Sequence, residues 1–110
     1  MRMSDIPFGV TDWDGVERSE HPGAAGIAWW RTCDFNGIRV RIVEYSPGYL
    51  ADHWCDKGHI LYCLEGEVVT ELADGRSVRL GPGMSLQVGD GAMAHRTRTG
   101  GVGARLFVVD

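Results

Sequence analysis

Short runs of β-branched and aromatic residues, separated by glycine-containing turns, follow one another along most of this chain. From residue 27 onward, a turn signal such as Asn36-Gly37 or Asp74-Gly75 recurs roughly every eight to twelve residues. No stretch longer than a turn or two has the spacing of apolar residues that a helix requires. This pattern predicts an all-β protein built as an antiparallel sandwich or barrel.

The turn signals divide the chain into an arm and about nine short strands. We expect strands at 27–33, 38–45, 50–55, 59–64, 68–72, 77–80, 84–88, from 95 onward, and at 104–109. Residues 1–26 lack this alternation and are expected to form an irregular N-terminal arm, anchored on the domain by Trp13. Within the arm, His21 is expected to be an exposed loop histidine. The chain is thus predicted to be a single domain, 1–110, with its barrel at 27–110.

The composition supports a globular protein and limits its partners. Of 110 residues, 16 are glycine and 4 are proline, and 44% are hydrophobic, which suits a turn-rich domain with one core. The formal net charge of −4 argues against nucleic acid or an anionic membrane as a partner, because both require a basic surface. We therefore expect a small-molecule ligand.

Targeting signals and cysteine spacing indicate the compartment. No apolar run has the length of a signal peptide or a membrane span, so we expect a cytoplasmic protein. Cys33, Cys55 and Cys63 are odd in number and show no Cys-x-x-Cys spacing, which argues against a disulfide framework. Their thiols are then available for packing or for a metal, and we expect Cys63 to pack in the core.

Potential metal ligands are concentrated between Gly48 and Gly66 and recur at one later position. In extended strands, residues two apart share a face, so His53 and Cys55 point to one side, and His59 can approach them from a neighbouring strand. His95 follows after a gap that suits a hairpin leaving and returning to the same mouth of a barrel. Histidines hydrogen-bonded inside a barrel without an ion are the alternative.

These spacings resemble the two motifs of the cupins, small jelly-roll barrels. The first motif reads Gly, five residues, His-x-His, three or four residues, Glu, six residues, Gly. Gly48 matches its opening glycine with one residue fewer before His53, Cys55 stands at the second histidine, His59 stands at the glutamate, and Gly66 closes the motif.

The second cupin motif reads Gly, five residues, Pro-x-Gly, two residues, His, three residues, Asn. Gly83, Gly91 and His95 match it, whereas Gly89 replaces the proline, one extra residue precedes the histidine, and Thr99 replaces the asparagine. More narrowly, the Asp-His-Trp-Cys run at 52–55 is similar to that of the small cupins named after a DHCW motif, a group without a settled activity.

The resemblance implies an antiparallel jelly-roll barrel with a divalent transition metal at its mouth. The expected ligands are His53, His59 and His95, with Cys55 as a further candidate. Imidazole and thiolate donors favour Zn, Fe, Ni or Cu over Mg or Ca. Three histidines would leave open positions for catalysis, whereas an added thiolate would make a closed, structural site.

The predicted function is that of a metal-dependent enzyme acting on a small polar molecule, as an oxygenase, an isomerase or a lyase. A non-enzymatic module that binds a small ligand or a metal is the alternative, and a barrel without an ion is the third. No catalytic residue can be assigned from the sequence. Glu44 shares a strand face with Ile38, Val40 and Ile42, which favours that face as the interior, but Glu44 itself is either a strand-end carboxylate that reaches solvent or a buried carboxylate near the metal.

Two further features bear on binding and assembly. Arg39 and Arg41 alternate with apolar residues, as do Arg96 and Arg98, so that each pair is either a solvated strand face or the rim of a pocket for a carboxylate or phosphate. Because a jelly roll leaves edge strands that pairing would cover, we expect a homodimer.

Overall fold

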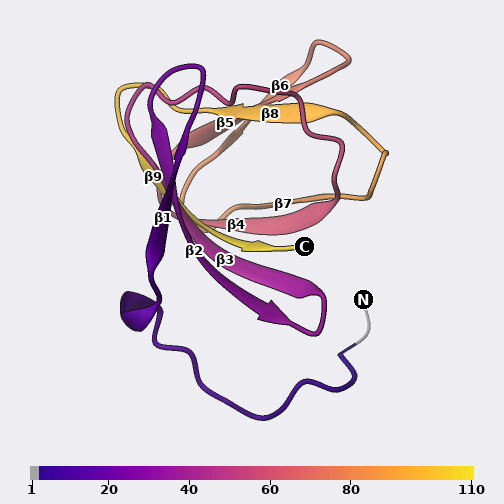
Figure 1. Ribbon diagram of the computed structural model, residues 1–110. Helices are drawn as coiled ribbons and strands as arrows, with labels where there is room; N and C mark the ends of the chain where they lie inside the picture. Colours follow the sequence, from indigo (N-terminus) through magenta and orange to yellow (C-terminus); the bar gives the residue numbers. More distant parts are fainter. Residues whose placement is uncertain (1–2) are drawn as a thin grey trace.

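The computed structural model describes residues 3–110, which form two antiparallel sheets that face each other (Figure 1). The larger sheet has the order β1 (Arg18–Pro22), β2 (Ile27–Phe35), β3 (Ile38–Tyr45), β9 (Ala104–Val109), β4 (His59–Gly66) and β7 (Ser85–Val88). The smaller sheet has the order β6 (Ser77–Leu80), β5 (Val68–Leu72) and β8 (His95–Arg98). The predicted all-β jelly roll is thereby confirmed.

The two sheets are joined without being closed into a barrel. Within residues 3–110, they are linked by connecting segments, one of which bridges β8 through Leu50 and Cys55, while the edge strands β7 and β8 do not pair with each other. The molecule therefore has two facing layers with an open side, and the predicted site lies at that side.

The predicted strand at 50–55 is wrong in its middle. Leu50 and Cys55 are five residues apart, whereas their bridge partners on β8, Arg98 and His95, are three apart. The two extra residues cannot enter the ladder, so the chain bends outward between the two bridges, and residues 52–54 are exposed there. This bulge decides where His53 lies.

The N-terminal arm is irregular up to the short 3-10 helix η1 (Trp13–Gly15), but β1 then pairs with β2 along its whole length. Trp13 rests edge-on against Phe107, with ring centroids 6.4 Å apart, as expected of an anchor. The prediction for His21 is wrong, because this residue lies within β1 and stacks on Trp30 at 3.7 Å between centroids. A neighbouring strand and an aromatic face therefore hold it.

The two faces of β3 have the reverse of the expected roles. Arg41 is 7% exposed and Val43 is 1% exposed between the sheets, whereas Glu44 points the other way, 3.8 Å from Arg105. Glu44 therefore takes the solvent alternative that the sequence left open, whereas the face that its apolar neighbours favoured as the interior is the outer one. On this outer face, Ile38 and Val40 line a cavity together with residues of the N-terminal arm.

A compact apolar cluster holds the two layers together. Its buried members come from both sheets and are Ala28, Val43, Leu61, Cys63, Val68, Leu80, Ala104, Leu106 and Val108. Cys63 is 0% exposed, as expected for a packing role. No helix in residues 3–110 is long and apolar enough to cross a membrane.

Candidate functional site

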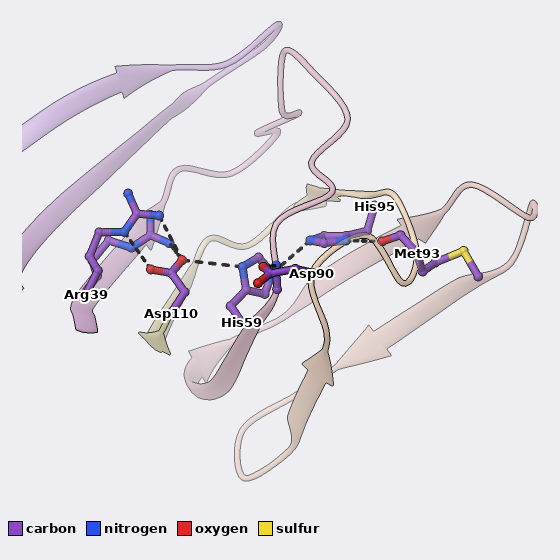
Figure 2. A network of polar contacts seen from close by, with 8 residues as sticks. Arg39, His59, Asp90, Met93, His95 and Asp110 are labelled. Atoms are coloured by element: carbon purple, nitrogen blue, oxygen red, sulfur yellow. Dashed lines mark hydrogen bonds and ion pairs between the residues drawn. The ribbon is translucent and has the colours of Figure 1, made fainter. Parts of the chain in front are cut away.

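His59 and His95 meet between the two sheets. His59 is the first residue of β4 in the larger sheet, and His95 is the first residue of β8 in the smaller one. Their Nε2 atoms lie 3.0 Å apart, and the rings are nearly perpendicular, at 78° (Figure 2). Two of the predicted ligands, distant in sequence, are thus brought together.

Each imidazole has a second polar contact on its outer side. Nδ1 of His95 lies 2.8 Å from the carbonyl oxygen of Met93. Because a carbonyl can only accept, His95 must carry its proton on Nδ1, which leaves a lone pair on Nε2. Nδ1 of His59 faces Asp110, with its nearest carboxylate oxygen at 3.8 Å. Figure 2 shows these contacts as one row from Arg39 to Met93.

Asp110 connects the histidine pair to two arginines. Its side chain is 1% exposed and accepts hydrogen bonds from Nε and Nη2 of Arg39, at 2.8 and 2.9 Å, and from Nη2 of Arg41, at 3.0 Å. Burial by itself would raise the pKa of Asp110, but these hydrogen bonds and charges outweigh it and hold the pKa below its usual range. Asp110 is therefore a carboxylate at neutral pH, placed behind His59.

Burial also controls the charge of His59. It lowers the pKa of His59 to about 4, and the neighbouring His95 acts in the same direction. The imidazole is consequently neutral at pH 7, which is the state that binds metals.

Cys55 lies directly beside His95. The two residues exchange both backbone hydrogen bonds, at 2.7 Å from the Cys55 amide and 2.9 Å from the His95 amide. Residues paired in this way in an antiparallel ladder project to the same side. Cys55 is half-buried and lines the same pocket as His59 and His95.

His53 stands apart from the histidine pair. It lies in the bulge between Leu50 and Cys55, where its side chain is 75% exposed and its Nδ1 lies 2.6 Å from Asp52. It lines the outer part of the same pocket. Among the side chains of residues 3–110, no group of three His, Cys, Asp or Glu lies close enough together to hold a metal ion.

The histidine pair by itself has the spacing of two metal ligands. Two nitrogens that each lie about 2.1 Å from an ion are about 3.0 Å apart when the nitrogen–ion–nitrogen angle is a right angle. They are about 3.4 Å apart when that angle is tetrahedral. The observed separation of 3.0 Å fits the first case. The residues therefore fit two cis positions of a transition-metal site, with Cys55 and His53 as the nearest candidates for further positions.

A pocket of about 340 Å³ opens beside the pair. It is lined by Trp30, Arg39, Tyr45, Tyr49, Ala51, His53, Cys55, Lys57, His59, His95, Arg96 and Thr97. A second cavity, of about 240 Å³, shares His95 with it and is otherwise mostly apolar. These volumes suit a small organic molecule.

Three functional features could not be identified from the sequence in advance. Asp110 carries no local signal, because its role depends on the strand order that places β9 between β3 and β4. The inward direction of Arg41, which is 7% exposed, runs against the apolar alternation of β3. Tyr45 lines the pocket with a neutral hydroxyl, since burial raises its pKa to about 12.

No protein-family model matches this chain, and no curated protein matches it significantly. Solved structures do match. The polyketide cyclase RemF from Streptomyces resistomycificus is 26% identical, with a TM-score of 0.77 over 94% of this chain and 78% of that one. A sugar phosphate isomerase from a cupin superfamily of Silicibacter pomeroyi is 19% identical, with a TM-score of 0.71 over 92% and 74%. This chain has the cupin fold.

A predicted oxalate decarboxylase from Thermotoga maritima agrees with the cupin fold over nearly its full length. It is 17% identical, with a TM-score of 0.78 over 92% of this chain and 96% of that one. The similarity of these cupin structures establishes a small cupin domain and no particular activity. The narrower resemblance to the DHCW group stays a prediction.

Proposed function

We propose that this cupin domain is a metal-dependent enzyme that binds a divalent transition metal through His59 and His95 and acts on a small polar molecule. The observation that carries the proposal is the approach of the two Nε2 atoms to 3.0 Å. The two side chains come from opposite sheets, and both line a pocket of ligand size. A metal held there would have a ligand pocket beside it, as a catalytic metal requires.

The tautomers of the pair include one that suits a cation between the rings. His95 keeps its proton on Nδ1, toward Met93, so a direct His59–His95 hydrogen bond needs the proton of His59 on Nε2. Nδ1 of His59 would then turn a lone pair toward the Asp110 carboxylate. With the proton on Nδ1 instead, two lone pairs converge, and a metal ion satisfies both.

Other residues of the pocket would complete the site. Cys55 or His53 could supply a third ligand and leave a coordination position open, and such donors favour Zn, Fe, Ni or Cu. A bound ion would supply Lewis acidity or a site for oxygen. Tyr45 keeps its proton at neutral pH and can donate a hydrogen bond to a ligand, while Trp30 and Tyr49 cover the pocket walls.

The test is metal content after loading with Zn²⁺ or Fe²⁺ and removal of free metal, measured by elemental analysis. The wild type should retain about one ion per chain, and His59→Ala and His95→Ala should retain much less. His21→Ala is the matched control, since this histidine lies outside the pocket and should leave the metal content unchanged. Equal metal in His59→Ala, His95→Ala and wild type would refute the proposed ligands.

The reaction class is tested separately on the loaded protein. Oxygen uptake by the iron form with small polar substrates would indicate an oxygenase, whereas conversion without oxygen would indicate an isomerase or lyase. The cupin structures described above include enzymes named as an isomerase, a cyclase and a predicted decarboxylase, which supports an enzymatic role. Activity that persists in the His59→Ala and His95→Ala variants would contradict a metal-centred reaction.

A non-enzymatic module that binds a small ligand is the second candidate. It is favoured by the separation of 3.0 Å, which also suits a direct hydrogen bond that needs no ion. In that case ligands would raise the melting temperature of metal-free protein without being converted. Ligand stabilisation that appears only after metal loading would exclude this candidate.

We also propose that the domain is a homodimer. The larger sheet ends in the edge strands β1 and β7, and Ile60 and Tyr62 of β4 are 53% and 43% exposed. Exposed edges and apolar side chains of this kind are commonly covered by association. Light scattering coupled to size exclusion should give twice the mass of the chain, and a monomer at micromolar concentration would contradict this.

A further inference from the structure

The charges and cavities around His95 define the class of molecule that the pocket accepts. We infer that the ligand is a small organic anion with an apolar body, whose anionic group lies near Lys57 and Arg96 and whose body extends toward the second cavity that His95 also lines. This inference rests on the proposed function, since it places the anion beside the proposed metal.

The lining of the 340 Å³ pocket is basic. Arg39, Lys57 and Arg96 contribute to it together with three histidines, and no Asp or Glu does. Lys57 takes part in no ion pair or side-chain hydrogen bond within residues 3–110, although its positive charge is felt by Asp110. A pocket with this lining attracts anions and repels cations.

Two carboxylates near the pocket each form ion pairs with two arginines. Asp110 pairs with Arg39 and Arg41, and Glu71 pairs with Arg96 and Arg98. Arg41 is 7% exposed, and its Nε has no hydrogen-bond partner in the described structure. Four guanidinium groups thus share two carboxylates beside the pocket, and an anion in the pocket would compensate the excess positive charge.

Arg96 is held ready for a ligand. Its Nε donates to Glu71 at 2.7 Å, and its guanidinium lies 4.8 Å from the ring centre of Trp54. These contacts fix the plane of the guanidinium. Within residues 3–110, Nε is the only nitrogen of this guanidinium that donates a hydrogen bond. The remaining N–H groups can form the paired hydrogen bonds that carboxylates and phosphates accept.

The second cavity indicates what is attached to the anionic group. It is lined by Leu72, Val78, Leu86, Val88 and Met93, with Thr70, Gln87, Arg76 and His95 as its polar members. His95 thus lines both a basic cavity and a mostly apolar one. A ligand that contacts both cavities would carry its charge at one end and an apolar group at the other, with His95 beside it.

The experiment uses the fact that Lys57 is the only lysine in the chain. Reductive methylation with ¹³C-formaldehyde gives Lys57 its own NMR signal, distinct from that of the α-amino group. Zinc-loaded protein is titrated with butanoate, butyl phosphate, butan-1-ol and butan-1-amine. The two anions should shift the Lys57 signal saturably, and their relative affinities distinguish a carboxylate site from a phosphate site. The alcohol and the amine should leave it unshifted.

Variants then assign the effect to the pocket, with affinities measured by calorimetry. Lys57→Gln should weaken anion binding about tenfold and Lys57→Arg should restore most of it, whereas Arg79→Gln, outside the pocket, should change nothing. Equal binding of butanoate and butan-1-ol, or unchanged binding by Lys57→Gln, would overturn the inference. Anion binding by a protein that retains no metal after loading would support the anion site while contradicting the metal proposal, so the two failures are distinguishable.

Discussion

Cys55 and His95 form a directly opposed backbone pair, so that the thiol and the imidazole project from neighbouring strands to the same side. This relationship places a soft donor beside a histidine whose Nε2 lies 3.0 Å from that of His59. It makes Cys55 the residue whose role most affects the chemistry of the site, because a bound thiolate closes a coordination position that catalysis would use.

We predict that Cys55 binds the metal as a thiolate. The Co²⁺-substituted protein should then show a thiolate-to-metal charge-transfer band that disappears in Cys55→Ser. Cys33→Ser, which changes a half-buried cysteine of β2 outside the pocket, should keep the band. Identical spectra for wild type and Cys55→Ser would show that the thiol is not a ligand and that an open site is formed by histidines.

Replacing Asp110 should destabilise the fold strongly. Asp110→Asn leaves Arg39 and Arg41 without their buried carboxylate, and breaking a buried ion pair costs about 3 kcal/mol or more. Urea unfolding followed by tryptophan fluorescence measures the change. Asp56→Asn, at an exposed position, should alter the free energy of unfolding by less than about 0.5 kcal/mol. Similar unfolding midpoints for the two variants would contradict the role given to Asp110.

Gly66 should tolerate no side chain. It ends β4 with φ of +73°, and a Cβ there would overlap the carbonyl oxygen of Gly103. Gly66→Ala should therefore lower the free energy of unfolding by at least about 2 kcal/mol. Gly101→Ala is the control, because nothing lies within 4 Å of its Cβ position. Thermal unfolding of both variants measures the difference. Equal melting temperatures would show that the backbone contact between Gly66 and Gly103 leaves room for a side chain.

The ion pairs of Glu71 with Arg96 and Arg98 should make the stability of the fold fall at acid pH. The hydrogen bond from Arg96 is the main cause of the lowered pKa of Glu71, and Arg98 acts in the same direction. A lowered pKa in the folded state stabilises the fold above the usual pKa of a glutamate, and this contribution is lost as the pH falls through the lowered value. Glu71→Gln should thus melt below the wild type at pH 7, and the gap should shrink below about pH 4. A gap independent of pH would contradict this.

Local sequence patterns predicted the elements of the fold well. The alternation at Ile38–Tyr45 and the turn at Asp74-Gly75 give strands with the bounds that the structure has, because period-two alternation and glycine turns act within a few residues. The cupin motif spacing likewise located His59 and His95, which face each other at 3.0 Å.

Local patterns failed where burial depends on distant parts of the chain. The apolar face of Ile38–Tyr45 was favoured as the interior, but Arg41 and Val43 of the opposite face lie between the sheets and Glu44 points outward. His53 was expected to align with Cys55, but two extra residues between the bridges to β8 displace it to the rim. Neither the packing of β3 against the other sheet nor the register of β8 is visible within the segment concerned.

The sequence by itself thus determined an all-β domain, its turns and the residue types that can hold a metal, since these depend on interactions between near neighbours. Only the tertiary structure decided which donors meet, which face of β3 is inside, and that Asp110 stands between two arginines and His59. Those outcomes depend on the order in which strands pair across the whole chain. A shift of one residue in that pairing would turn every side chain to the opposite face.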